Sequence, residues 1–420
     1  MGLTRLQKIV YGSGRFGSTI LLNIASLATF YVYLKKYNLN PVLNGIANGI
    51  GKLAIAISGV VMGYISDATV HPKLGKRKPY IISGSIFLAV SFLLLFFPEF
   101  FIDVRDQMLL FAYEAFFISA FNFAYGYLLT PYQAWMPEIT EVHERSEVSG
   151  YENIFNLLGN IVGTGGSFLM PMIINNTKLL FQMLLVLSII EIIMYIAPTV
   201  ILMEPKKYLP IPKLSLKEIA IVLHDINFVY WMLAQGTLSV GLVIVITLLL
   251  PFIESLGFVG LQYLGVSMGL MLTILVAFFI WMKLPSKITV KKTMTYSLMI
   301  MVIFLLILPL RIFIPDQAIF SVIVLGAAAV GIAGYWIMVY VVQANIIEMN
   351  ARATNVSRAG TYLGLNGLVL NIFQAAAYWL TGYIVKIDPN YIIWTIIAAI
   401  FIFLGALIFQ KVQPDIPPEE

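Results

Sequence analysis

The feature that most constrains the fold is a short basic segment set between two long apolar runs. Residues 43–64 and residues 81–97 are each apolar enough to cross a bilayer, whose hydrocarbon core needs about 20 apolar residues per helix. The segment that joins them, residues 63–80, reads GYISDATVHPKLGKRKPY and is rich in Lys and Arg. Because short loops of this composition stay on the cytoplasmic side, the two runs are predicted to form a transmembrane hairpin that turns inside the cell.

The composition extends this prediction to the whole chain. Hydrophobic residues make up 60% of the sequence and charged residues 11%, against about 45–50% and 25% in soluble proteins. An all-α polytopic membrane protein is therefore expected. The net charge of +5 follows from cations in loops rather than from a nucleic-acid-binding face. With no cysteine and three scattered histidines, neither a metal site nor a cofactor is expected.

Hydropathy predicts twelve spans. Lys and Arg residues outside the spans are biased, with eighteen on the side of the basic segment and six on the other. This bias predicts a multi-pass plasma-membrane protein with both termini in the cytoplasm. The spans are expected near residues 9–34, 43–66, 79–98, 108–133, 148–173, 179–203, 227–251, 260–284, 293–314, 318–342, 359–385 and 390–410.

The long polar interruption at 206–226 predicts a cytoplasmic linker between two halves. The N-terminal six-helix bundle is expected at 1–205, and the C-terminal bundle with its short tail at 227–420. The halves match at a constant offset of 210 residues, as in Gln133 with Gln343. Parallel six-helix repeats place the solute site at the membrane midplane between halves, and one half rocks on the other.

Two segments carry a resemblance to a known family. Residues 63–80 resemble the loop between helices 2 and 3 of major-facilitator transporters, since Gly-x-x-x-Asp is followed by Gly-Lys-Arg-Lys-Pro-Tyr. Residues 130–163, which begin TPYQAWMPEIT, are similar to a signature of the glycoside-pentoside-hexuronide:cation symporters, the family of melibiose permease, with sucrose-type carriers as relatives. The resemblance implies a twelve-helix major-facilitator fold and secondary transport of a sugar, a glycoside or a similar polar solute.

Polar side chains form stripes on several predicted spans. Amides and hydroxyls donate and accept hydrogen bonds, and aromatic rings cover the apolar side of a sugar, so such stripes suit a polyhydroxylated neutral solute. The alternative is that the amides join helices to one another. The predicted solute-binding residues are Thr19, Asn23, Gln133, Asn153, Asn156, Trp336, Tyr340, Asn366 and Asn371.

Charged residues inside the spans are few and costly to bury alone. Arg15 and Glu152, on helices 1 and 5, are predicted to form an ion pair, as are Lys52 and Glu114 in the outer parts of helices 2 and 4. Glu191, midway along helix 6, has no predicted partner. For all of them the alternative is a protonatable site that couples transport to an ion.

A cytoplasmic gate is predicted from the loop charges. Asp67, followed by Lys76, Arg77 and Lys78, is expected to hold the cytoplasmic ends of helices together in one state of the cycle. Glu138 and Glu348, 210 positions apart, are expected to receive cations in the same gate.

The chain departs from melibiose permease at the cation site. Where the resemblance places two aspartates of helix 2, this chain has Ile55 and Gly59, which offer no side-chain oxygen for sodium. Proton symport is therefore favoured, with uncoupled uniport as an alternative.

Other functions stay open. Leu129 and Leu370 stand where the resemblance expects charges, which would suit a carrier of lipids or amphipathic solutes. A membrane sensor without turnover is a further alternative, whereas an enzyme is not expected because no catalytic constellation stands out. The partners expected are a small solute, a co-transported proton and the bilayer, and the chain is expected to act as a monomer.

Overall fold

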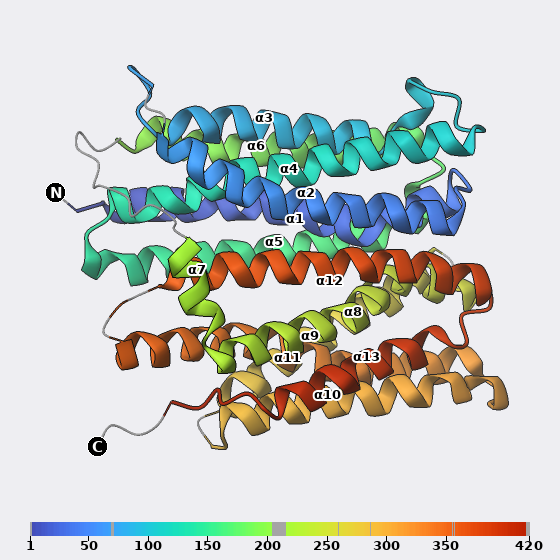
Figure 1. Ribbon diagram of the computed structural model, residues 1–420. Helices are drawn as coiled ribbons and strands as arrows, with labels where there is room; N and C mark the ends of the chain where they lie inside the picture. The colour runs from blue at the N-terminus through green and yellow to red at the C-terminus, as the bar shows by residue number, and fades with distance from the viewer. Residues whose placement is uncertain are drawn as a thin grey trace. The chain divides into compact units, whose positions relative to one another are not determined.

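The computed structural model describes residues 2–68, 71–203, 216–258, 260–285, 287–354, 356 and 358–416. Over these ranges the regular structure is helical (Figure 1). The chain divides into two compact units, Met1–Pro212 and Lys213–Glu420.

Each of the twelve predicted spans overlaps one long helix of the two units. The first unit holds α1 (Arg5–Lys35), α2 (Pro41–Ala68), α3 (Lys78–Leu95), α4 (Gln107–Ile139), α5 (Arg145–Ile173) and α6 (Thr177–Ile201). The second holds α7 (Leu216–Leu223), α8 (Ile226–Ser255), α9 (Leu261–Lys283), α10 (Val290–Ile307), α11 (Gln317–Thr354), α12 (Ala359–Ile387) and α13 (Trp394–Phe409).

Length and composition agree with a membrane protein. Among the described residues, ten helices are long and apolar enough to span a bilayer, while α13 is a shorter apolar helix. The more polar α5 is 29 residues long. Its glycines and amides lower its hydropathy, and they also pack it against α1, as shown below.

The differences from the predicted boundaries have local causes. The ninth predicted span ran to residue 314, but α10 ends at Ile307 and continues as a 3₁₀ turn, Leu308–Phe313, with Pro309 in its first positions. The last span was expected from residue 390, but α13 begins at Trp394 because Asp388 accepts the backbone N–H groups of residues 392, 393 and 394 in a turn. Residues 206–215 of the predicted linker, 206–226, lie outside the described residues, and the rest includes the unpredicted helix α7.

Both units use the same set of helix pairings. In the first unit α1 packs on α5 and α6, α4 packs on α2 and α3, and α3 packs on α6. In the second, α8 packs on α12 and α13, α11 packs on α9 and α10, and α10 packs on α13. The helices that correspond in these pairings are also related by the sequence offset, since Gln107 and Gln317 begin α4 and α11. The repeat in the sequence is therefore a repeat in the packing.

Glycines allow a close contact in the first unit between the neighbouring helices α1 and α5 (Figure 1). A Cβ on Gly159 would come 2.7 Å from the Phe16 carbonyl oxygen, and one on Gly163 would come 2.8 Å from Asn23 Cβ. Small residues let transmembrane backbones approach this closely. The approach brings the polar stripes of α1 and α5 into direct contact.

Candidate functional site

A ladder of three polar pairs joins α1 to α5 at successive turns. In every pair the second residue lies 137 positions after the first, so the two helices run parallel and in a fixed register. The pairs of this α1–α5 ladder are Arg15 Nε with Glu152 Oε1 at 3.7 Å, Thr19 Oγ1 donating to Asn156 Oδ1 at 2.7 Å, and Asn23 Nδ2 donating to Asn160 Oδ1 at 2.8 Å.

Several residues predicted to bind solute or to form ion pairs are part of the α1–α5 ladder. The structure brings Arg15 and Glu152 together as an ion pair. Thr19 and Asn156, both predicted to bind solute, are bonded to each other, and Asn23 also donates to the Thr19 carbonyl. Their amides and hydroxyl therefore join helices here, which is the alternative that the sequence left open. Asn153 lies off the ladder with an exposed side chain.

Two tyrosines, which the sequence did not single out as a pair, fasten α1 to α4 at the end of the unit that holds the N-terminus. The rings of Tyr11 and Tyr132 stack with centroids 4.6 Å apart. Each hydroxyl donates to the backbone carbonyl of the other residue. Gln133, a predicted solute ligand next in the chain, is exposed, so it is available to a solute in a way that Tyr132 is not.

A chain of amides links Glu114 on α4 to α2 and α1. Asn48 Nδ2 donates to Glu114 Oε1 at 2.8 Å and to Asn44 Oδ1 at 2.9 Å. Asn44 Nδ2 in turn donates to the Phe30 carbonyl at 2.8 Å. All three polar side chains are buried, and Glu114 is 0% exposed. The sequence analysis paired Glu114 with Lys52, and that ion pair stays a prediction.

Glu191 on α6 is buried without a hydrogen-bond partner among the described residues. Its backbone lies against α1 so closely that a Cβ on Gly17 would collide with Glu191 Cα. One turn along α6, Tyr195 shares a hydrogen bond of 2.8 Å with Ser18 of α1. A buried carboxyl that lacks donors is strongly destabilised as an anion. This side chain therefore suits the neutral, protonated form.

Four of the predicted gate residues meet around one guanidinium. Arg77 is 2% exposed and contacts Asp67 Oδ1 at 2.6 Å, Glu138 Oε1 at 3.0 Å and Ser66 Oγ at 2.8 Å. Lys76 Nζ lies 3.2 Å from the same Asp67 oxygen. Burial lowers the pKa of Arg77, but Glu138 and Asp67 outweigh this effect and raise the pKa above its ordinary value. These residues are called the gate cluster below.

Lys78 and Glu348 lie differently from the other predicted gate residues. Lys78 Nζ donates to the Leu202 carbonyl at 2.7 Å, after the end of α6. Glu348 Oε1 accepts from Arg352 Nε at 2.8 Å, one turn along its own helix, with both side chains about half exposed. This ion pair therefore lies on the surface of one helix, whereas the gate cluster joins α2, α3 and α4.

The candidate solute ligands of the second unit lie on α11 and α12. On α11, Trp336 and Tyr340 are one turn apart, 38% and 72% exposed. On α12, Asn366 is buried, and Asn371 Nδ2 donates to the Gly367 carbonyl of the same helix. The two exposed rings form a surface of the kind that covers the apolar side of a sugar.

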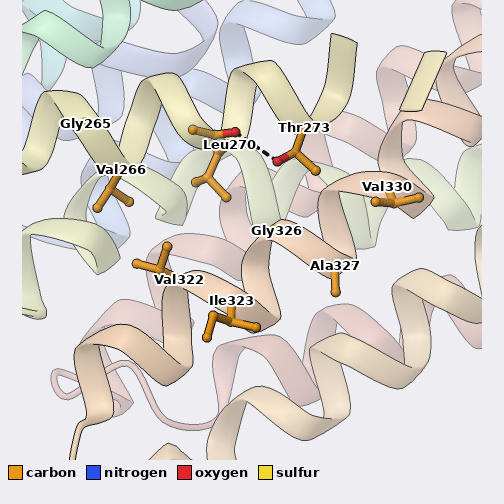
Figure 2. Close-up of a pocket in the computed structure, with 10 residues that line it drawn as sticks. Gly265, Val266, Leu270, Thr273, Val322, Ile323, Gly326, Ala327 and Val330 are labelled. Atoms are coloured by element: carbon orange, nitrogen blue, oxygen red, sulfur yellow. Dashed lines mark hydrogen bonds between the residues drawn. The ribbon is translucent and has the colours of Figure 1, made fainter. Parts of the chain in front are cut away.

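A groove of about 590 Å³ separates parts of α9 and α11 within the second unit (Figure 2). The polar side chain in its lining is Thr273, whose hydroxyl donates to the Gly269 carbonyl at 2.9 Å. An apolar groove of this kind offers little to a sugar and more to a hydrocarbon chain. Its lining consists of Gly265, Val266, Gly269, Leu270, Thr273, Val322, Ile323, Gly326, Ala327 and Val330.

Two units with the same six-helix packing define a transporter of the major-facilitator fold, and solved structures agree over nearly the whole chain. A D-xylose–proton symporter matches with a TM-score of 0.70 and 14% identity, covering 97% of this chain and 96% of that one. The xylose transporter of E. coli in its inward-open conformation matches with a TM-score of 0.71 and 13% identity, covering 98% and 97%. At these identities the likeness concerns the fold.

Residues 10–391 match the family model described as MFS/sugar transport protein. The chain therefore belongs to this family, that of the glycoside-pentoside-hexuronide symporters within the major facilitator superfamily. It is a multi-pass membrane transporter and not an enzyme. The predicted fold class and family are confirmed.

Named relatives match over shorter stretches. An uncharacterized symporter of Synechocystis sp. is 30% identical over 158 residues, which is 37% of this chain and 29% of that protein. A putative sulfoquinovose importer of Salmonella typhimurium is 26% identical over 170 residues, 39% of this chain and 34% of the importer. The matched stretch thus spans about a third of each curated relative.

Proposed function

We propose that this transporter carries a sugar, a glycoside or a similar polar solute by alternating access, in symport with protons rather than sodium. It would act as a monomer of the plasma membrane, with both termini in the cytoplasm. The observation that carries the proposal is a set of buried or half-buried carboxyls on the long helices of the first unit: Glu114, Glu152 and Glu191. Such groups in spanning helices mark proton relays in pumps and transporters. By contrast, Ile55 and Gly59 supply no side-chain oxygen at the two positions where the resemblance to melibiose permease implies sodium ligands.

The solute contacts proposed for each unit are its accessible polar and aromatic groups. The first unit would contribute Gln133 and Asn153, whose side chains are exposed. The second would contribute Trp336, Tyr340 and the amides of α12. Thr19, Asn23 and Asn156 would act through the α1–α5 ladder, which fixes the helix that presents Asn153. The gate cluster would close the cytoplasmic side in one state of the cycle and come apart in another.

Uptake into proteoliposomes tests this function. A panel of labelled neutral sugars and glycosides, together with sulfoquinovose because a relative is named as its putative importer, is offered with a proton gradient, with a sodium gradient and with neither. Accumulation above equilibrium with the proton gradient alone is the expected result. Equilibration without any effect of gradients would make the protein a uniporter, and accumulation driven by sodium would overturn the assignment of the ion.

A carrier of lipids or amphipathic solutes is the second candidate, and the groove between α9 and α11 favours it. Its lining would accept an acyl chain in preference to a hydroxylated ring. Flux of a fluorescent lysolipid across the bilayer, with no flux for any member of the sugar panel, would favour this function over the first.

A further inference from the structure

The carboxyls of the first unit differ in what surrounds them. Glu152 is 16% exposed and paired with Arg15, so its anion is compensated. Neither oxygen of Glu191 has a hydrogen-bond partner among the described residues. No hydrogen bond there stabilises the anion or changes strength when the carboxyl ionises. Glu114 lies between these cases, because Oε1 accepts from Asn48 while Oε2, also buried, has no partner in the described part of the chain.

The single donor on Glu114 belongs to a continuous chain of hydrogen bonds. Asn48 Nδ2 donates to the Glu114 carboxyl and to Asn44 Oδ1, and Asn44 Nδ2 donates to the Phe30 carbonyl. The chain therefore crosses from α4 through α2 to α1. A change of charge on Glu114 alters the strength of the first bond, since hydrogen bonds to ionised groups are roughly twice as strong as neutral ones. Three helices are thus sensitive to one proton.

The titratable groups around Glu114 leave its second oxygen unoccupied. From α1, the hydroxyl of Tyr33 donates to the Leu95 carbonyl at 2.8 Å, and on α4 that of Tyr113 donates to the Leu94 carbonyl at 2.7 Å. Lys52 lies one turn beyond Asn48 on α2, and the titratable residues of α3, Lys78 and Tyr80, stand at its opposite end. Both phenols are engaged by α3 carbonyls, so neither donates its proton to Glu114 in this conformation.

Glu114 lies near the end of the unit at which α4 begins. It lies seven residues after Gln107, the first residue of α4, which is about 10 Å along the axis. Asn44 and Asn48 similarly belong to the first two turns of α2. This end of the unit is the predicted extracellular one.

We propose that Glu114 is the proton-binding group that couples solute entry to the proton gradient, an inference that rests on the proposed function. Oε2 takes up one proton from the extracellular side, and the neutral carboxyl still accepts from Asn48 through Oε1. The same proton leaves Oε2 toward the cytoplasm after solute release, which restores the anion. No other bond is made or broken.

The test compares Glu114→Gln with Glu99→Gln, the same change at a carboxyl of the first unit that is paired with Lys36 at 2.7 Å. Each variant is reconstituted and assayed for solute exchange without a gradient and for accumulation with the outside acidic. With a gradient of about one pH unit, one-to-one symport holds about tenfold accumulation. Glu114→Gln is expected to exchange solute but to accumulate none above equilibrium, because Gln keeps the bond with Asn48 and cannot release a proton. Glu99→Gln is expected to accumulate like the unchanged protein, because this carboxyl belongs to an ion pair with Lys36 and is not part of the proposed proton path.

Each other outcome has a distinct meaning. Proton-driven accumulation by Glu114→Gln overturns the inference and leaves the proposed function standing. Failure of the unchanged protein to exchange any solute overturns both. A thermal melt in detergent checks folding, and a folded Glu114→Gln variant without exchange would assign Glu114 to translocation itself, against the inference.

If Glu114→Gln does not fold, Asn48→Leu tests the same point. Removing the amide donor disfavours the anion, so the pH at which uptake is half-maximal is expected to move upward. An unchanged pH profile in this variant contradicts the inference.

Discussion

The two units pair their helices identically, yet equivalent positions at one end of the bundle carry different chemistry. In the first unit, Asp67 and Arg77 take part in a buried ion cluster with Glu138. The positions 210 residues later are Ala277 and Lys287. Ala277 is buried against Trp281 and Ala333, while Lys287 is exposed.

The difference shows that the repeat preserves the arrangement of the helices but not the side-chain interactions that stabilise it. An ion cluster can be broken by a change of partner or protonation, whereas apolar packing has no such control. The Trp281 indole reinforces the packing by donating to the Val330 carbonyl at 2.8 Å. We therefore expect the first unit to carry the part of the gate that responds during the cycle.

The largest effect is expected from Arg77→Ala. Removing the guanidinium leaves Asp67 and Glu138 near each other without their shared cation, which costs about 3 kcal/mol of folding free energy when a pair is largely buried. The melting temperature in detergent should fall clearly. The control, Lys287→Ala at the equivalent exposed position, should melt like the unchanged protein, and equal losses in both variants would remove the asymmetry.

A second comparison concerns glycines in the equivalent helices α5 and α12. At Gly163 a methyl group would meet the Ile20 backbone and Asn23 Cβ at 2.8 Å, whereas at Gly364 it would meet nothing within 4 Å. Gly163→Ala should destabilise the protein by about 1–3 kcal/mol through overpacking. Gly364→Ala should be neutral or stabilising by up to about 1 kcal/mol, because alanine is the better helix former. Thermal melts of the two variants measure these changes in stability. Equal changes in melting temperature for the two variants would contradict the prediction.

The α1–α5 ladder is expected to contribute less per bond. A double-mutant cycle of Thr19→Val and Asn156→Leu should give a coupling energy of about 0.6 kcal/mol, the average for hydrogen bonds between transmembrane helices. The cycle is measured by unfolding in mixed detergent. Additive losses would show that the two side chains do not support each other, and would return them to the set of solute ligands.

The smallest effect is expected at the exposed pair of the second unit. Arg352→Ala removes an i,i+4 ion pair with Glu348, both about half exposed, and such pairs are worth about 0.3–0.5 kcal/mol. The loss should diminish further in high salt. A loss comparable to that of Arg77→Ala would mean that Glu348 does belong to a gate like that of the first unit.

The sequence predicted the helices well because each span depends on its own apolar content. It erred where one residue sets a boundary, as Asp388 does before α13 by accepting three backbone N–H groups. The short α7, with eight residues, gave no signal of its own beside three prolines upstream.

The site was predicted less completely, because contacts between helices depend on register. Stripes of spacing four on α1 and α5 were visible in the sequence, but their shared difference of 137 residues has meaning only once the two helices are known to pack in parallel. For the same reason the sequence could not show that Asn48, one turn from Lys52 on α2, donates to Glu114. The contacts of the gate cluster were easier to predict from the sequence. Its charged residues lie near the ends of helices, and a short loop joins the helix of Asp67 to α3, which begins just after Arg77.

Proton entry that accompanies solute entry tests the central claim most directly. Proteoliposomes loaded with a pH-sensitive dye receive an external pulse of a transported solute without any imposed gradient. The account predicts that the lumen acidifies as solute enters, and that a proton carrier abolishes the signal. Entry of labelled solute with no change in luminal pH would contradict proton symport by this protein.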